Sequence, residues 1–337
     1  MLIRKRRGWE IPERRATGES VYWNRRSFLR GAGLASIGAL TVGCVTEEDL
    51  AAEKPAKKTK QRGEGLRGQA AIDEAVRLHP GAYPAPRSEK FELDRPLTDE
   101  KVAASYNNFY EFKNDKELLA ERATKLTLRP WTVEIDGLVE RPMTLDVDEI
   151  LKRLPVEERL YRHRCVEAWS MAVPWTGISM KAFVEMAKPL SAARFVRFVS
   201  FNRPKEAIGQ REDTHYPWPY YEGLRLDEAV NELTLLTTGI YGKPLPPQHG
   251  APVRIVTPWK YGYKSIKSIV RVEFVEDRPG TFWNDLQPRE YDFLSNVDPA
   301  VPHPRWSQAT ERVLGTDERV PTLPYNGYGE WVAGLYA

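Results

Sequence analysis

Tyr161-Arg162-His163-Arg164-Cys165-Val166-Glu167-Ala168-Trp169-Ser170-Met171 is the stretch on which the prediction of fold and function depends. It contains Cys165, and the other cysteine of the chain, Cys44, lies in an N-terminal segment with a different character. Without a second cysteine in the body, Cys165 has three possible roles. It can be a small buried hydrophobe, a catalytic nucleophile with a histidine base, or a thiolate ligand of a metal that a cofactor also holds.

The regions around this stretch predict a fold dominated by strands. The chain has 337 residues, of which 41% are hydrophobic and 29% charged, as in globular proteins. Its 26 prolines favour strands joined by irregular loops over a helical bundle. Alternating or apolar runs predict strands over residues 131–139, 194–201, 253–256 and 268–275, and short helices are expected over 116–125, 145–154 and 179–188. Asp115 is the expected cap of the first of these helices. We see no βαβ rhythm, and no Gly-rich phosphate loop of the dinucleotide or Walker type.

Charge is unevenly distributed along the chain. Residues 1–43 hold nine basic and three acidic residues, against totals of 50 and 47, so the remainder carries a net charge of −3. A mildly acidic body has no electrostatic footprint for nucleic acid, and we expect no nucleic-acid partner.

The N-terminal segment resembles an export signal. Asn24-Arg25-Arg26-Ser27-Phe28-Leu29-Arg30 precedes a weakly apolar run from Gly31 to Val45, which is shorter than the about 20 residues that a membrane span needs. This order predicts a twin-arginine signal peptide over residues 1–45, hence transport of the folded protein to the periplasm. Cys44 is also a candidate for a lipid anchor, although Thr41 stands where lipoprotein signals prefer Leu.

Residues 46–96 are expected to form a flexible linker and an extended arm. Thr46 to Gly68 is rich in Lys, Glu, Ala and Gly, and Pro80 to Pro96 is rich in proline. A helix is expected to start near Thr98-Asp99-Glu100-Lys101, and the third division, residues 97–337, is the expected functional domain.

A basic, proline-rich segment from Tyr241 to Lys267 allows two interpretations. Its cations, Arg254, Lys260, Lys264 and Lys267, can form a solvated face or a pocket for an anion such as a terminal phosphate.

Three motifs together resemble one known family. RCVEAWSM at residues 164–171, NNFYEF at 107–112 and PWKYGYKSIKS at 258–268 are similar to segments of periplasmic protein-methionine-sulfoxide reductase catalytic subunits, the MsrP family. The resemblance extends from about Ser105 to near Tyr328. It implies a mainly β, α+β sulfite-oxidase-type fold that binds Mo-molybdopterin, with Cys165 as the molybdenum ligand.

The same resemblance assigns further residues to the cofactor. The implied contacts are Asn107, Tyr110, Glu111, Ser200, His249, Arg254, Ser265, Ile266 and Lys267. His249 stands where the family has Asn, Ser200 where it has Thr, and His163 where it has Met. Trp169 and Trp175 are candidates for an aromatic rim around the metal, and a core role for each is equally open.

The implied activity is reduction of methionine sulfoxide in envelope proteins, which leaves a thioether and releases the oxygen as water. The chain has no haem-attachment motif and no iron–sulfur or nicotinamide motif, so an external electron donor is needed. The resemblance implies a haem-containing membrane subunit of the MsrQ type, with oxidised periplasmic proteins as substrates and the twin-arginine machinery as export partner. The alternatives are a sulfite oxidase of the same fold and an exported lipoprotein without enzymatic activity.

Overall fold

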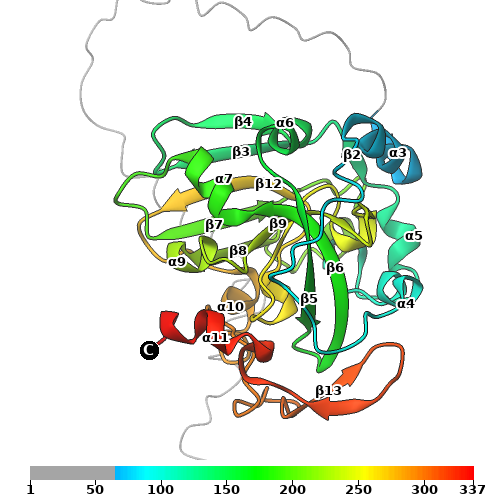
Figure 1. Ribbon diagram of the computed structural model, residues 1–337, viewed down its shortest axis with the longest axis vertical. Coiled ribbons are helices and arrows are strands. Elements are labelled where there is room, and N and C mark those ends of the chain that lie inside the picture. The colour runs from blue at the N-terminus through cyan, green and yellow to red at the C-terminus, as the bar shows by residue number, and fades with distance from the viewer. Residues whose placement is uncertain (1–64) are drawn as a thin grey trace, which may run out of the picture. The chain divides into compact units, whose positions relative to one another are not determined.

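Two β-sheets dominate residues 65–337, the part of the chain that the computed structural model describes. The predictions for the signal peptide, for Cys44 and for the linker up to residue 64 concern residues outside this range. As expected, strands predominate, helices are short, and the fold is of the α+β class (Figure 1).

The first sheet contains three of the predicted strands. Its order is β4 (Met143–Asp146), β3 (Thr132–Gly137), β12 (Ile269–Val275), β7 (Phe195–Ser200) and β8 (Tyr221–Arg225). β12 is parallel to β3 and antiparallel to β7, so a late segment of the chain completes the middle of an early sheet. The end of β3 needs glycine, because Gly137 has φ +78° and a Cβ there would lie 2.3 Å from the Phe274 carbonyl oxygen.

The second sheet is built around one long buried strand, β6 (Trp169–Ser179), of which only Ser179 is not buried. Its order is β10 (Lys243–Pro244), β9 (Leu235–Ile240), β6, β13 (Thr310–Val313) and β14 (Arg319–Pro321). β11 (Arg254–Val256) pairs with β9, and β5 (Glu157–Arg164) forms an antiparallel hairpin with β6. The Cys165 stretch is therefore the turn of the β5–β6 hairpin. A further two-stranded sheet joins β1 (Leu66–Arg67) to β2 (Thr127–Arg129).

Short helices cover the sheets. They are α3 (Gly68–Leu78), α4 (Glu100–Ser105), α5 (Leu119–Ala123), α6 (Val147–Arg153), α7 (Met180–Ala187), α8 (Ile208–Glu212), α9 (Leu226–Ala229), α10 (Phe282–Leu286) and α11 (Gly329–Val332). Single 3₁₀ turns are η2 (Tyr110–Phe112), η3 (Pro247–His249), η4 (Gly262–Lys264), η5 (Pro324–Gly327) and η6 (Ala333–Leu335). In Figure 1, α3, α5 and α4 lie along one side of the described part.

One predicted helix is shorter than expected. The helix expected over 116–125 is reduced to α5. The Asp115 carboxylate accepts hydrogen bonds from the backbone N–H groups of Glu117 (3.2 Å) and Leu118 (3.3 Å), the contacts expected of a cap, but residues 116–118 form a turn and the helix begins only at Leu119. The expected start of α4 is confirmed, since the Asp99 carboxylate accepts from Lys101 and Val102.

Part of the segment expected to be linker is structured. Gly68–Leu78 forms α3, whose Ala71 and Ala75 are buried. The proline-rich part that follows lies on the body as an extended arm: Arg87 bridges to Glu158 of β5, and Phe91 is buried against the core.

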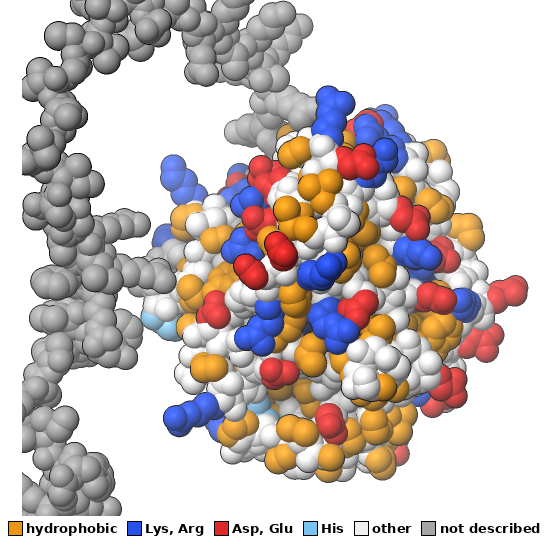
Figure 2. All heavy atoms as spheres, turned by 90° about the vertical axis from the view of Figure 1, so that its left-hand side faces the viewer, with side chains coloured by type: hydrophobic (Ala, Val, Ile, Leu, Met, Phe, Trp, Pro, Cys, Tyr) orange, Lys and Arg blue, Asp and Glu red, His pale blue; other side chains and the backbone are white. Residues whose placement is uncertain are grey.

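Helix hydrophobicity and surface charge are two further features of residues 65–337. No helix in residues 65–337 combines the length and the hydrophobicity that crossing a membrane requires. On the face shown in Figure 2, acidic and basic side chains are interspersed with hydrophobic ones.

Candidate active site

A cavity of about 450 Å³ lies at the turn of the β5–β6 hairpin. Four segments form its walls: the loop through η2, the hairpin turn, the loop through η4, and the region from α10 to residue 306. Aromatic and polar side chains line it, including Asn107, Asn108, Phe109, Tyr110, Glu111, His163, Cys165, Glu167, Trp169, Tyr220, Arg254, Tyr263, Ser265, Ile266, Lys267, Trp283, Tyr291, Arg305 and Trp306.

Cys165 is a free cysteine at the floor of this cavity and is 6% exposed. A tight turn holds it: the Cys165 N–H donates to the Trp169 carbonyl (2.9 Å), and the Ala168 N–H donates to the Cys165 carbonyl (3.0 Å). Ala168 has φ +62°, a conformation that costs energy in a non-glycine residue and is maintained here by the surrounding contacts.

The protonation of Cys165 distinguishes between its possible roles. Burial, together with the nearby Glu167 carboxylate, raises the pKa of the thiol to about 12. His163 also lines the cavity, but burial and the positive charge of Arg254 lower the pKa of its imidazole to about 3. Within residues 65–337 no histidine is hydrogen-bonded to the Cys165 sulfur, so the pair that a cysteine nucleophile requires is not formed there. A bound metal ion, by contrast, deprotonates a coordinating thiol.

Glu167 organises the polar groups around the cysteine. Its Oε2 accepts hydrogen bonds from Asn108 Nδ2 (3.1 Å), Lys116 Nζ (3.0 Å) and Trp169 Nε1 (3.1 Å). Burial alone raises its pKa, but the Asn108 hydrogen bond and the Lys116 charge together hold it below its ordinary value. Asn108 Nδ2 and the Glu167 N–H both donate to the Cys165 sulfur, at 3.5 and 3.4 Å.

The NNFYEF segment reaches the cavity through η2. Asn107 Nδ2 donates to the Ala103 carbonyl (3.0 Å), which fixes the side chain while it lines the cavity. Glu111 is 3% exposed, and burial raises its pKa to about 7. Gly209 of α8 permits this packing, because a Cβ there would lie 2.0 Å from the Tyr110 carbonyl oxygen.

Two cations on the opposite wall have no carboxylate partner in the described part of the chain. Arg254 donates to the carbonyls of His249 (2.8 Å), Ser265 (2.8 Å) and Ile255 (3.3 Å). Lys267 Nζ donates to the carbonyls of Gln248 (2.7 Å) and Asn108 (3.0 Å). Burial lowers the pKa of Arg254 to about 9 and that of Lys267 well below its ordinary value. A dianionic group beside them would compensate both charges.

The structure brings together eight of the ten predicted site residues. Asn107, Tyr110, Glu111, Cys165, Arg254, Ser265, Ile266 and Lys267 all line the cavity. Ser200 and His249 lie behind this wall. The Ser200 hydroxyl donates to the Lys267 carbonyl (2.9 Å), and His249 Nδ1 is buried without a hydrogen-bond partner. Trp169 lines the cavity, whereas Trp175 is fully buried and belongs to the core.

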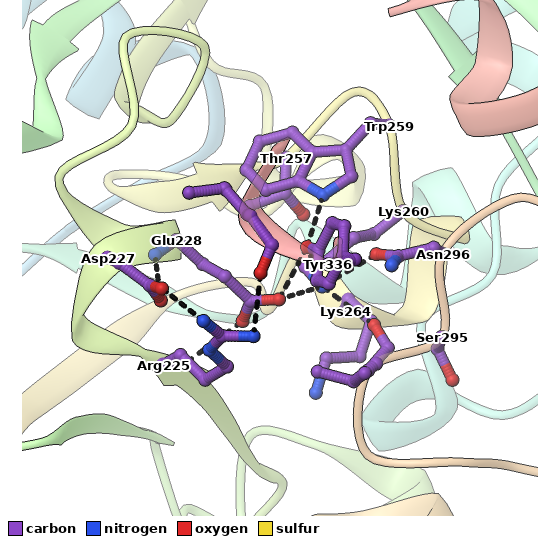
Figure 3. A network of polar contacts seen from close by, with 12 residues as sticks. Arg225, Asp227, Glu228, Thr257, Trp259, Lys260, Lys264, Ser295, Asn296 and Tyr336 are labelled. Atoms are coloured by element: carbon purple, nitrogen blue, oxygen red, sulfur yellow. Dashed lines mark hydrogen bonds and ion pairs between the residues drawn. The ribbon is translucent and has the colours of Figure 1, made fainter. Parts of the chain in front are cut away.

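Both interpretations of the basic segment are wrong for Lys260 and Lys264. Neither lysine is solvated and neither lines the cavity: both are 1% exposed and point into a buried polar network (Figure 3). Lys260 pairs with Glu228 (2.6 Å) and Lys264 with Glu222 (2.6 Å). The local sequence pattern does not predict these two ion pairs, because the glutamates lie more than 30 residues earlier in the chain.

Several residues that shape the cavity were not predicted. Asn108 and Glu167 lie inside the two motifs, so a closer reading of those motifs could have included them. Tyr291, Arg305 and Trp306 come from a region without regular structure, and nothing in their local sequence marks them.

Comparison with known proteins identifies the class of enzyme to which the fold belongs. Residues 121–283 match the family model described as oxidoreductase molybdopterin binding domain, which agrees with the sulfite-oxidase-type expectation. Among solved structures, the sulfane dehydrogenase SoxCD of Paracoccus pantotrophus aligns with 12% identity and a TM-score of 0.39, covering 55% of this chain and 54% of that one.

Curated relatives narrow the class to one family. The chain is 44% identical to the protein-methionine-sulfoxide reductase catalytic subunit MsrP of Burkholderia mallei, over 100% of this chain and 97% of that protein. It is 46% identical to the MsrP proteins of Xanthomonas axonopodis pv. citri and Xanthomonas campestris pv. campestris, over 97% of this chain and 95% of each of them. The chain therefore belongs to the MsrP family of protein-methionine-sulfoxide reductase catalytic subunits.

The residues present fit a molybdopterin. Cys165 offers a sulfur ligand, and Arg254 and Lys267 offer charge to a phosphate. The Ser265 hydroxyl accepts from the Thr257 N–H (3.2 Å), lies 3.4 Å from the Thr257 hydroxyl and lines the cavity, where a phosphate oxygen can contact it. Asn108 Oδ1, on a residue that lines the cavity, is a buried polar atom without a partner, as expected where a polar ligand is to bind.

Proposed function

We propose that this chain reduces methionine sulfoxide in proteins of the cell envelope, using molybdenum held by molybdopterin. The observation that carries the proposal is that the free, buried Cys165 lines one cavity with two cations that have no carboxylate partner within residues 65–337, in a chain that belongs to the MsrP family. The overall reaction consumes two electrons and two protons: the S=O bond is cleaved, a thioether remains and the oxygen leaves as water.

The protein residues have distinct tasks in this proposal. Cys165 ligates the molybdenum, while Arg254, Lys267 and the Ser265 hydroxyl bind the terminal phosphate of the pterin. The remaining predicted contacts, Asn107, Tyr110, Glu111, Ser200, His249 and Ile266, surround the cofactor. The bound cofactor supplies oxygen-atom transfer and two-electron redox chemistry; the chain positions it and tunes it.

The aromatic wall suits a sulfur substrate. Tyr110, Trp283, Tyr291 and Trp306 line the cavity, and sulfur makes favourable contacts with aromatic rings. Burial raises the pKa of Tyr110, so its hydroxyl stays protonated at neutral pH and can donate a hydrogen bond to the sulfoxide oxygen. Tyr110 packs edge-to-face on Trp283, with ring centroids 4.9 Å apart.

The decisive experiment combines metal analysis with two assays on one preparation. Purified protein should contain molybdenum and pterin, and reduced dyes should drive turnover of methionine sulfoxide, with higher rates on an oxidised, partly unfolded protein. Rapid sulfite oxidation without sulfoxide turnover would assign the sulfite-oxidase alternative, and absence of metal would favour the lipoprotein. Cys165→Ser, which replaces a soft thiolate by a poor ligand, should leave a soluble protein without activity.

Location and electron supply are part of the same proposal. The Arg25-Arg26 motif supports export of the folded protein to the periplasm by the twin-arginine machinery. The double variant Arg25→Lys, Arg26→Lys should remain in the cytoplasm with its cofactor, and normal periplasmic levels would contradict the export proposal. Whether Cys44 is lipidated can be read from the mass of the mature protein.

A haem-containing membrane subunit of the MsrQ type is the proposed electron donor. The relatives are named catalytic subunits, which supports the existence of a partner subunit. Deleting the gene for that partner should abolish sulfoxide reduction in cells while dye-driven activity of the isolated protein persists. Unchanged activity in the deletion strain would identify another donor.

A further inference from the structure

The peptide carbonyl next to Cys165 is held from two sides. The Val166 oxygen accepts hydrogen bonds from Trp306 Nε1 (2.7 Å) and from Gln308 Nε2 (2.8 Å). Both donors belong to one segment that runs from the cavity wall into β13. Two side-chain donors on a single loop carbonyl fix the orientation of that peptide plane.

Gln308 uses both ends of its amide. While Nε2 donates to Val166, Oε1 accepts from a guanidinium nitrogen of Arg164 at 2.8 Å. The side chain is buried, with 1% exposure. Arginine can only donate and a carbonyl can only accept, so the amide has one possible orientation.

Arg164 connects Gln308 to the backbone of Cys165. It is fully buried, pairs with Glu311 through Nε (3.0 Å), donates to Thr322 Oγ1 (3.2 Å) and also donates to the Cys165 carbonyl. Glu311 is in turn bound by Arg95 (3.1 Å). The carbonyls of Cys165 and Val166 are therefore both fixed by the same anchored network.

Fixing two successive carbonyls fixes the backbone between them. Because peptide units are planar, the dihedral angles around Val166 and the direction of the Cys165 side chain are then constrained. Partners that orient a metal ligand without touching the metal commonly change affinity or activity by about 10–100-fold.

We propose that Gln308 is a positioning residue for the metal-ligating cysteine: its amide locks the Val166 carbonyl to Arg164 and so sets the direction in which Cys165 presents its sulfur. The inference rests on the proposed function, since it concerns the cysteine assigned there as metal ligand. It adds a residue 143 positions away in sequence to the determinants of the site.

The test variant is Gln308→Glu, which is close to isosteric. The carboxylate still accepts from Arg164 but no longer donates to the Val166 carbonyl. We expect molybdenum and pterin contents equal to wild type, an altered electron paramagnetic resonance signal of the bound molybdenum, a kcat about tenfold lower and an unchanged KM. Trp306→Phe removes the second donor to the same carbonyl and should alter the resonance signal as well.

Asn231→Asp is the matched control. Like that of Gln308, its amide donates through the nitrogen and accepts through the oxygen: it donates to the Trp331 carbonyl (3.2 Å) and accepts from the Leu233 N–H (3.0 Å), and it does not line the cavity. The same chemical change there should leave the resonance signal unaltered.

A second readout needs no metal. In cofactor-free protein, the rate of alkylation by iodoacetamide, measured on the peptide that contains Cys165, should rise severalfold in Gln308→Glu and in Trp306→Phe because the loop is released. An unaltered resonance signal in loaded Gln308→Glu overturns the inference. If Gln308→Glu does not fold, an unaltered signal and an unaltered alkylation rate in Trp306→Phe overturn it instead. A wild-type protein without molybdenum contradicts the proposed function, which is a distinguishable failure.

Discussion

Two pairs of cations from one stretch of sequence meet opposite environments. Lys260 and Lys264 each face a buried glutamate. Among residues 65–337, Arg254 and Lys267 have no carboxylate partner and instead contact backbone carbonyls, an asparagine oxygen and the faces of aromatic rings. All four side chains are removed from bulk water to a large degree. What separates them is whether the protein itself provides the opposite charge.

The difference teaches how to recognise a binding cation in a folded protein. A lysine whose charge is neutralised by Glu228 has no need of a ligand, and it serves to tie β11 and η4 to α9 and to Tyr336 (Figure 3). A buried arginine that receives only dipoles retains an uncompensated charge, which an anionic ligand stabilises.

Breaking a neutralised pair should have the largest effect on stability. Glu228→Gln leaves the Lys260 ammonium buried without its carboxylate, so the free energy of unfolding should fall by about 3–5 kcal/mol. Urea denaturation monitored by tryptophan fluorescence measures this. The molecules that do fold should keep their molybdenum, and selective loss of metal from an otherwise stable variant would contradict the comparison.

The carboxylic acid near the unpaired cations should make stability depend on pH. Burial raises the pKa of Glu111 from 4.5 to about 7, so the folded state binds more protons than the unfolded state between these values. The stabilisation is complete below pH 4.5 and is lost as the pH rises through about 7, by roughly 3 kcal/mol in cofactor-free protein.

Glu111→Gln should remove this pH dependence. Denaturation of cofactor-free wild type and variant at a series of pH values between 4 and 8 supplies the test. Parallel curves for the two proteins would show that Glu111 does not titrate in this range.

Removing an unneutralised cation should affect the cofactor more than the fold. Lys267→Met keeps the length of the side chain and deletes the charge, and retention of molybdopterin should fall by about 10–100-fold, roughly 1.4–2.8 kcal/mol. Cofactor-free Lys267→Met should be at least as stable as cofactor-free wild type. A variant that is equally well loaded would remove Lys267 from the anion site.

Breaking an exposed ion pair should have the smallest effect on stability. Lys243 pairs with Glu100 at 2.9 Å, and the two side chains are 62% and 48% exposed. Lys243→Gln should change the free energy of unfolding by less than about 1 kcal/mol and leave cofactor content untouched. A larger effect would show that the exposure of an ion pair does not determine how much the pair contributes to the free energy of unfolding.

Local patterns predicted much of the fold and most of the site. The strands at 132–137, 195–200 and 269–275 follow from alternation, and α6 is capped by Asp146 within the range expected for that helix. The family resemblance predicted eight residues that line one cavity, although they come from four separate segments.

The wrong prediction for Lys260 and the missing prediction for Gln308 have a common physical cause. The fate of Lys260 depends on Glu228, and the role of Gln308 depends on Arg164, so in each case the partner is remote in sequence. A local sequence pattern does not show which side chain of a loop will lie next to a buried carboxylate from a distant segment. The short α5 is a different kind of error: the Asp115 carboxylate makes the contacts of a cap, but residues 116–118 form a turn and the helix starts only at Leu119.

The network around the Cys165 turn has a consequence for folding kinetics. Its hydrogen bonds join residues 142, 144 and 158 positions apart, as in the contacts of Arg164 with Gln308 and Thr322. Contacts of such separation close late, because a long chain segment must first be ordered. A chain still being synthesised cannot complete this network until Thr322 is available. If Cys165 ligates the molybdenum as proposed, we expect cofactor insertion to require a nearly complete chain.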